Sequence, residues 1–344
     1  MSSQKYEKLT HEEHIKKLPE TYIGSIEENK EELWYINRKK ELMEKKELTF
    51  IPGEYKLFDE LIVNALDQYT RLKESHDNDH IVNPVRNIKI TYDKQSGEIS
   101  VFNDGDGITI KKHEKEKIWI PELIFGHLLT SSNYNEKEKK HVGGKNGYGA
   151  KLANIFSTKF IIETVDSYNK KIFTQTFYEN MTKRDTPTVV SYRKKPYTKI
   201  TYIPDYKRFN KTGLTDDMIL IIEKRAYDVA AFTNANVNVF INETKIECKT
   251  FDKYVNLYIG NKSDTPRAYE KNNRWEIACS LNATGQFDQI SFVNGIHTNK
   301  GGKHVDYIVN QITKKLIDYI YKKKKINAKP IFIKENILLF LNCT

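Results

Sequence analysis

The hydrophobic pattern is clearest between residues 58 and 71, where it follows the period of a helix. Apolar residues recur there at the i, i+3, i+4 spacing of an amphipathic helix: Phe58, Leu61, Ile62, Ala65, Leu66 and Tyr69. The helical period gathers four polar residues within roughly 60° of one another on the opposite face: Glu60, Asn64, Asp67 and Arg71. A solvated helix face usually carries Lys and Glu, so we examine this stripe for chemistry.

The polar stripe suits the handling of a phosphate. A carboxylate at Glu60, one turn before the amide of Asn64, is able to hold a water molecule beside a metal ion, and Arg71 is able to steady a phosphate. The same residues also fit an ordinary surface stripe with i, i+4 pairs. This helix alone leaves both interpretations open.

Alternation of apolar and polar residues predicts strands along much of the remaining chain. A hairpin is expected at 88–92 and 99–102, and successive antiparallel strands at 160–165, 171–178, 189–192 and 200–203. A helix at 216–232 and a hairpin at 237–241 and 245–247 follow. Beyond about residue 248 the pattern restarts, with a strand at 275–281, an apolar segment at 290–295 and a long helix at about 305–325, so we expect a second domain.

Two glycine-punctuated loops are the other candidates for a binding site. The first, 103–108, reads Asn-Asp-Gly-Asp-Gly-Ile and either approaches a ligand closely or is a simple turn. The second has four glycines between 143 and 149 and leads into a helix, so its free backbone N–H groups are able to cradle a triphosphate. It matches neither a Walker loop nor a Rossmann fingerprint. A purely structural glycine loop is the alternative.

Composition narrows the class of protein. The chain has 344 residues, 38% of them hydrophobic, and a formal charge of +10. This describes a globular protein and favours a polyanionic partner such as nucleic acid, although a Lys-rich proteome has the same signature. Three unpaired cysteines and the absence of a signal peptide or transmembrane run predict an intracellular protein without a membrane partner. His76 and His80 are interpreted as loop residues rather than metal ligands.

Several long motifs occur in one order along the chain. They are the segments 58–67, 103–108, 123–134 (Leu-Ile-Phe-Gly-His-Leu-Leu-Thr-Ser-Ser-Asn-Tyr), 143–156 and 289–311. Together they resemble the N-terminal ATPase region of eukaryotic-type (type IIA) DNA topoisomerase II. The resemblance implies an α+β chain: a Bergerat (GHKL) α/β sandwich followed by a transducer domain whose mixed sheet has a left-handed crossover helix. The implied boundaries are an N-terminal arm at 1–27, the ATPase domain at 28–247 and an incomplete transducer at 248–344.

The resemblance also implies roles for residues around the nucleotide. Glu60 resembles the general base that orients the attacking water, and Asn64 resembles the amide that binds Mg²⁺. Asn103 stands where the family contacts adenine, Arg71 lies near the phosphates, and Asp67 is included among the nucleotide-binding residues. The ribose and phosphate contacts correspond to Ser131, Ser132 and Asn133. The ATP lid corresponds to Gly144, Lys145, Asn146, Gly147, Tyr148, Gly149, Ala150 and Lys151.

Partners follow from the same resemblance. Tyr6 aligns with an arm residue that reaches the nucleotide of the other subunit in a closed homodimer. The run Lys322, Lys323, Lys324 and Lys325 matches a basic loop proposed to touch double-stranded DNA, and a solvated helix end is its alternative. The chain is then expected to be a gate that uses ATP and Mg²⁺, dimerises on binding ATP, and works in a nucleus or a viral factory. Another Bergerat ATPase (a mismatch-repair clamp or a chaperone) and a basic DNA-binding module without catalysis are the alternatives.

Three departures from the family pattern qualify this expectation. Leu18 stands where the family usually has an arginine, and Gln68 replaces a common asparagine. The family's Gln-Thr-Lys loop, whose lysine reaches the γ-phosphate, is expected beyond Thr344, so the sequence is expected to be a fragment. No DNA-attacking tyrosine with a carboxylate metal cluster is recognised in it either.

Overall fold

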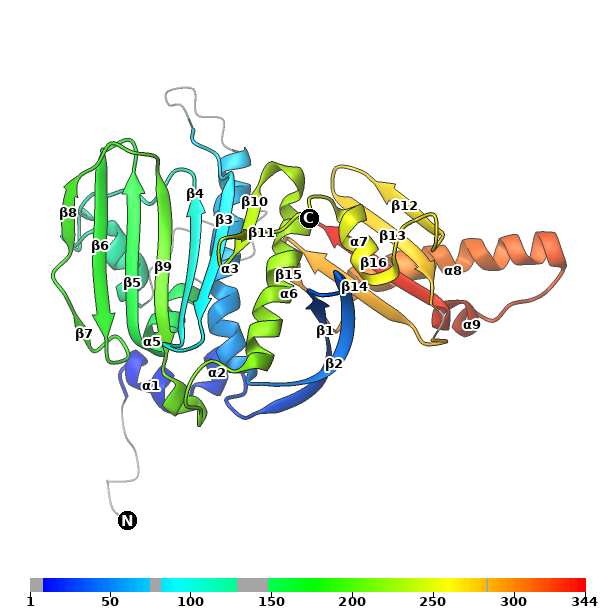
Figure 1. Ribbon diagram of the computed structural model, residues 1–344, viewed down its shortest axis with the longest axis horizontal. Helices are drawn as coiled ribbons and strands as arrows, with labels where there is room; N and C mark the ends of the chain where they lie inside the picture. Colours follow the sequence, from blue (N-terminus) through cyan, green and yellow to red (C-terminus); the bar gives the residue numbers. More distant parts are fainter. Residues whose placement is uncertain (1–8, 75–81, 129–147, 283) are drawn as a thin grey trace, which may run out of the picture. The chain divides into compact units, whose positions relative to one another are not determined.

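The computed structural model describes residues 9–74, 82–128, 148–282 and 284–344 (Figure 1). The chain forms two compact units. Unit 1 comprises Met1–Ile36, Lys45–Tyr227 and Ala235–Glu247, and unit 2 comprises Asn37–Glu44, Asp228–Asn234 and Cys248–Thr344. Each unit has its own sheet, and each is described by itself.

The elements from the first helix to the hairpin that ends unit 1 are α1 (His11–Lys17), α2 (Glu20–Ile23), β1 (Asn29–Asn37), β2 (Leu42–Phe50), α3 (Pro52–Glu74), β3 (Asn87–Asp93), β4 (Glu98–Asp104), α4 (Ile120–Gly126), α5 (Gly149–Ile155), β5 (Ser157–Asp166), β6 (Lys171–Tyr178), β7 (Lys183–Arg184), β8 (Thr188–Ser191), β9 (Tyr197–Pro204), η3 (Tyr206–Phe209), α6 (Asp216–Thr233), η4 (Asn234–Asn236), β10 (Asn238–Ile241) and β11 (Thr244–Lys245). Those that follow are α7 (Phe251–Ile259), β12 (Arg267–Lys271), β13 (Trp275–Leu281), β14 (Asp288–Val293), β15 (Ile296–His297), α8 (Lys303–Lys324), α9 (Pro330–Glu335) and β16 (Ile337–Cys343).

The large sheet of unit 1 has the strand order β11-β10-β3-β4-β9-β5-β6-β7, and β8 also pairs with β6. The predicted hairpin β3–β4 is confirmed, with Ile90 opposite Val101. The four successive strands expected at 160–165, 171–178, 189–192 and 200–203 are present as β5, β6, β8 and β9, and β9 lies between β4 and β5 in the sheet. The burial of Ile200, Thr201 and Tyr202 suits a central strand, whereas β8 is mostly exposed and suits an edge.

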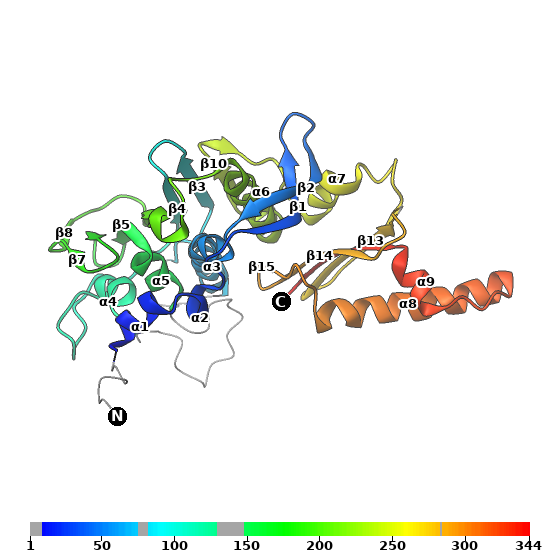
Figure 2. The same ribbon diagram turned by 90° about the horizontal axis from the view of Figure 1, so that it is seen from below.

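Helices α3, α4 and α5 pack on one face of this sheet, against β4, β5, β6 and β9 (Figures 1 and 2). The strands direct alternate apolar side chains, among them Phe160, Ile162, Phe173 and Phe177, into the core, where all four are fully buried. The period of two along a strand therefore places one face of the sheet on the core.

Unit 2 contains a five-stranded sheet in the order β12-β13-β16-β14-β15. Strands β14 and β16 are parallel neighbours, and α8 and α9 form the connection between them. One face of the sheet, with Leu339 and Leu341 of β16, packs on Val305 and Val309 of α8. Phe340 contacts Tyr258 of α7 at a ring distance of 5.3 Å. The predicted α+β class, with a mixed sheet joined by a crossover helix, is confirmed.

Several elements did not stand out in the sequence pattern. Strands β1 and β2 form a two-stranded sheet rich in exposed Lys and Glu, so their alternation is weak. Helix α7 and the largely apolar strand β16 were also not predicted. Within the described residues no helix combines the length and the hydropathy that a membrane span requires.

Candidate active site

Helix α3 carries the predicted polar stripe and buries almost everything else. It starts at Pro52, which suits a first helical turn, and Gly53 donates its N–H to Ser25 O at 2.8 Å. Phe58 and Ile62 are fully buried. On the other face Asn64 and Arg71 are exposed, whereas Asp67 is only 7% exposed. The stripe is therefore open at Asn64 and Arg71 and buried at Asp67.

A buried ion pair fixes the rotation of α3. Arg225 of α6 donates from Nε to Asp59 Oδ1 at 2.7 Å, and Arg225 is 1% exposed. Removing one partner of such a pair typically costs 3–5 kcal/mol, because the other charge stays buried. Since Asp59 immediately precedes Glu60, this pair also helps to fix the backbone from which the Glu60 side chain projects.

The Glu60 carboxylate lies where α3 meets the beginning of α5. Lys56, one turn earlier on α3, forms an ion pair with Glu60 Oε1. A Cβ placed on Gly149 would approach Glu60 Oε2 to 1.9 Å, so a larger residue at this position would displace the carboxylate or the start of α5. The backbone at the beginning of α5 thus closes over Glu60, and Asn64 follows one turn further along the exposed face of α3.

Gln68 connects α3 to the first glycine loop. Its Nε2 donates to Asp106 O at 2.6 Å, and Arg71 Nη1 donates to Gln68 Oε1 at 3.1 Å. The Asp106 carboxylate in turn accepts from Asn83 Nδ2 at 2.8 Å and from Ser167 Oγ at 2.7 Å. These bonds hold the loop at 103–108 against the side of α3 that carries the polar stripe.

Close packing explains the glycines of that loop. A Cβ on Gly107 would lie 2.2 Å from Val165 O, and the next residue, Ile108, donates its N–H to Thr164 Oγ1 at 3.2 Å. Asn103, the expected adenine contact, is 6% exposed and donates from Nδ2 to Asp104 O at 3.0 Å. The loop is therefore a rigid part of unit 1 rather than a simple turn.

Helix α5 supplies the described part of the predicted lid. Tyr148 precedes it and stacks edge-on with His11 of α1 at 5.7 Å between ring centroids. Ala150 and Lys151 are buried at 7% and 3% exposure. Burial lowers the pKa of Lys151 to about 8. A lysine in this environment gains from an anion brought close to it.

Several predicted residues lie outside the described residues. They are Tyr6, Ser131, Ser132, Asn133, Gly144, Lys145, Asn146 and Gly147. The lysine run is described: Lys322, Lys323 and Lys324 form the last turn of α8, and Lys325 is its left-handed C-cap. All four lysines are exposed.

Known proteins match nearly the entire chain. DNA topoisomerase 2 of Meyerozyma guilliermondii is 43% identical over 99% of this chain and 25% of its own length. The crystal structure of the ATPase region of Saccharomyces cerevisiae topoisomerase II is 42% identical, covers 99% of this chain and 87% of its own, and superposes with a TM-score of 0.89. The chain belongs to the DNA topoisomerase II family.

Two further comparisons agree with this assignment to topoisomerase II. The ATPase and transducer domains of Balamuthia mandrillaris DNA topoisomerase II match with a TM-score of 0.90 and 38% identity, over 100% of this chain and 86% of that chain. The family model of DNA gyrase B matches residues 231–344. The chain spans about a quarter of the length of the curated relatives that it matches, and it corresponds to their ATPase region. The predicted resemblance is confirmed.

Two residues of the topoisomerase II site were missed as positioning groups. Lys56 stands four residues before Glu60, and the i, i+4 rule was sufficient to pair them. Gln68 was noted only as a departure from the family, yet it makes the bond to Asp106. That bond joins residues 38 positions apart, and no local pattern predicts it.

The residues present fit a magnesium nucleotide. In the described ranges no group of three His, Cys, Asp or Glu is placed to hold a metal by itself. Mg²⁺ commonly uses one or two protein oxygens together with waters and substrate phosphates. The side-chain amide of Asn64 is exposed one turn from Glu60, and its oxygen is a ligand of the type that Mg²⁺ prefers.

Proposed function

We propose that the chain is an ATP-binding, Mg²⁺-dependent ATP-hydrolysing dimerisation gate of a type II DNA topoisomerase. The observation that carries the proposal is the environment of Glu60. This carboxylate is held by Lys56, is covered by the backbone at Gly149, and lies one helical turn before Asn64. Positioned groups of this kind suffice for phosphoryl transfer to water, which needs little covalent chemistry from the protein.

In this proposal Glu60 is the general base. Its carboxylate accepts a proton from the attacking water and orients that water in line with the γ-phosphate. Lys56 and the Asp59–Arg225 ion pair hold the carboxylate in one direction. Asn64 would hold Mg²⁺, which neutralises charge on the phosphates when it is bound.

Other residues would bind the nucleotide. Asn103 reads the adenine at the end of β4, and Ser131, Ser132 and Asn133 contact ribose and phosphate. Asp67 and Arg71 complete the phosphate side of α3. The lid from Gly144 to Lys151 closes over the triphosphate, and the buried lysine at its end contributes a positive charge.

The gate itself needs two copies. Tyr6 of the arm at 1–27 would reach the nucleotide of the second copy, so that ATP binding favours the homodimer. The ATPase domain at 28–247 would pass this change to the transducer at 248–344. The exposed lysines at 322–325 would contact double-stranded DNA, whose passage the gate controls in the nucleus or in a viral factory.

A titration with a non-hydrolysable ATP analogue tests the proposal. We expect saturable binding that is tighter with Mg²⁺ than without it, and light scattering should show the mass doubling as the analogue saturates. Binding without any change of mass would contradict the gate. The absence of analogue binding, together with DNA binding that ATP does not alter, would leave only a basic DNA-binding module.

A further inference from the structure

Three loops of unit 1 carry most of the net charge of the chain. They are the segments 111–119, 167–171 and 192–195, which we call the three-loop surface. They contain nine Lys or Arg and two Glu, a formal charge of +7 out of +10 for the entire chain. The nine cations are Lys111, Lys112, Lys115, Lys117, Lys170, Lys171, Arg193, Lys194 and Lys195.

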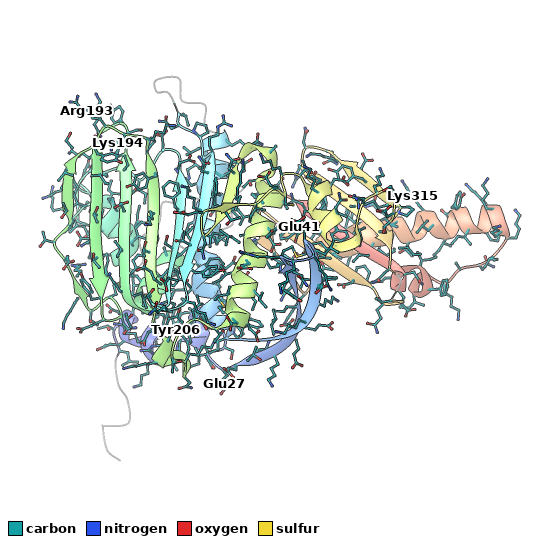
Figure 3. The ribbon with its side chains drawn as sticks, viewed as in Figure 1. Glu27, Glu41, Arg193, Lys194, Tyr206 and Lys315 are labelled. Carbon is teal, nitrogen blue, oxygen red and sulfur yellow. The ribbon has the colours of Figure 1, made fainter. Side chains whose placement is uncertain are left out.

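The three loops are neighbours in the fold. Tyr192 donates its N–H to Lys170 O at 2.8 Å, which joins the second loop to the third. Ile110, at the start of the first loop, donates its N–H to Asp166 Oδ2 at 2.7 Å, beside the second loop. Figure 3 shows Arg193 and Lys194 close together at the ends of the strands. The charges therefore gather beside the ends of strands β5, β6, β8 and β9.

The first loop has a defined conformation. Lys112 and Trp119 form an isolated antiparallel β-bridge through their backbones, and His113 donates its N–H to Ile118 O at 2.7 Å. Lys117 adopts the left-handed region, with φ 59°, and donates its N–H to His113 O at 2.9 Å. The loop is thus closed by its own backbone bonds, which hold its lysines in place at the surface.

Aromatic rings hold several of these lysines. The ammonium groups of Lys112 and Lys171 lie 5.7 and 5.8 Å from the ring of Trp119. Lys111 lies 5.7 Å from the ring of Tyr168, which is 64% exposed. Cation–π contacts of this kind restrict the lysines without neutralising their charge.

Within the described ranges of the chain, none of the nine cations forms an ion pair with a carboxylate. Lysines elsewhere in unit 1 do so, for example Lys94 with Asp216 at 2.6 Å and Lys183 with Glu179 at 2.7 Å. The charges of the three-loop surface therefore repel one another, and only Glu114 and Glu116 within the surface offset them. A polyanion laid across them relieves this repulsion and releases its own counterions.

We propose that the three-loop surface binds the phosphate backbone of duplex DNA, at a second site separate from the lysine run of α8. An acidic peptide would use buried apolar anchors at its interface. Among the described residues near this surface, the large apolar side chains that are well exposed are Tyr168 and Val190, which offer a peptide few such anchors. The inference rests on the proposed function only for the identity of the polyanion. It does not depend on ATP.

Salt-dependent DNA binding, measured without nucleotide, tests the inference. The variant R193A/K194A/K195A removes three cations, and each lost phosphate contact lowers the slope of log K against log salt by about 0.9. We expect the slope to fall by about 2 to 3 and affinity for a fluorescent duplex of about 25 base pairs to fall at least tenfold at about 0.1 M salt. Binding of the ATP analogue should not change, which separates this result from a failure of the ATP site.

Two matched variants make the test specific. K30A/K46A/K207A removes the same charge from exposed positions of unit 1 outside the surface, and it should change the slope by less than about 1. E114Q/E116Q adds two units of net charge to the surface and should tighten duplex binding. Equal losses in both triple variants, or duplex binding unchanged by R193A/K194A/K195A, would overturn the inference. The inference would also be overturned if R193A/K194A/K195A lost binding to an acidic peptide but kept its binding to the duplex.

Discussion

Helices α3 and α8 are nearly equal in length, with 23 and 22 residues, yet they use their polar faces in opposite ways. Helix α8 buries only Val305, Ile308, Val309 and Thr313. Its other face is exposed, and at its end the ammonium group of Lys325 lies 5.6 Å from the ring of Tyr321. Helix α3 is buried on most sides, and its polar residues Asp59 and Gln68 bond to Arg225 and to the backbone of Asp106.

This difference separates a site from a solvated face. Polar residues at helical spacing occur on both helices, so spacing alone does not distinguish them. On α3 the stripe converges with α5 and with the glycine loop, so that Glu60 and Gln68 are held by residues distant in sequence. On α8 the lysines face solvent and are suited to a diffuse electrostatic partner.

Replacing the proposed base gives the largest expected effect. Glu60→Gln keeps the shape of the side chain but removes the carboxylate that accepts the proton. We expect turnover to fall by more than ~10²-fold while analogue affinity stays nearly constant. Phosphate release in a coupled assay measures the first quantity. Normal release from the variant would remove Glu60 from its role and with it the contrast between the two helices.

The close approach of α5 to Glu60 gives the second prediction. In Gly149→Ala the added Cβ would meet Glu60 Oε2 at 1.9 Å, so either the carboxylate or α5 must move. We expect a loss of about 1–3 kcal/mol in the free energy of unfolding, as for other overpacked positions, and at least a tenfold loss of turnover. Urea titration followed by circular dichroism measures the stability.

A double-mutant cycle tests the cause of that loss. Glu60→Ala removes the carboxylate that the new Cβ would strike, so Gly149→Ala should cost much less in that background. Alanine is also the better helix former. Equal destabilisation in both backgrounds would show that Gly149 is required for a reason other than Glu60.

The third prediction concerns Lys151 and pH. Burial lowers its pKa to about 8, so the cation is lost as pH rises through 8 and is retained at pH 7. If this charge binds phosphate, analogue affinity should fall with rising pH by up to about tenfold per pH unit above 8. Lys151→Met should bind more weakly at pH 7 and should show a flatter profile between pH 7 and 9. Parallel profiles for the two proteins would exclude the lysine from the phosphate site.

The stability of the folded chain also depends on the protonation of Lys151. The pKa of Lys151 in the folded chain lies below the ordinary lysine value of 10.5, so the unfolded chain binds more protons between about pH 8 and 10.5. Lys151 therefore adds stability as pH rises through this window. Deprotonation of Lys151 does not destabilise the fold, so unfolding caused by this residue does not explain the expected weakening of nucleotide binding above pH 8.

Local periodicity predicted the long helices α3, α6 and α8 and most strands of the molecule, but not which strands are neighbours. The apolar stripe of α3 and the alternation of β3 and β4 are encoded within single segments. The insertion of β9 between β4 and β5 depends on pairings between segments that are far apart. Strands β1 and β2 were missed because exposed Lys and Glu dilute their alternation.

The candidate site divides in the same way. Glu60 and Asn64 were recognisable because they share one helix and one face. The contact of Gly149 with Glu60 and the bond from Gln68 to Asp106 bring together groups that no spacing rule connects. The sequence therefore suggested the proposed catalytic groups, whereas the structure was required for the residues that contact them.

The smallest expected effect compares one lysine from each helix. Lys56→Ala removes the ion pair to Glu60, whose partly exposed geometry is worth only about 0–1 kcal/mol in stability, but it frees the carboxylate to rotate. We expect a two- to fivefold loss of turnover with little change in analogue affinity. Lys322→Ala on the exposed end of α8 is the matched control and should leave turnover unchanged. Equal effects of the two substitutions on turnover would mean that Lys56 acts through the net charge of the chain and not through its ion pair with Glu60.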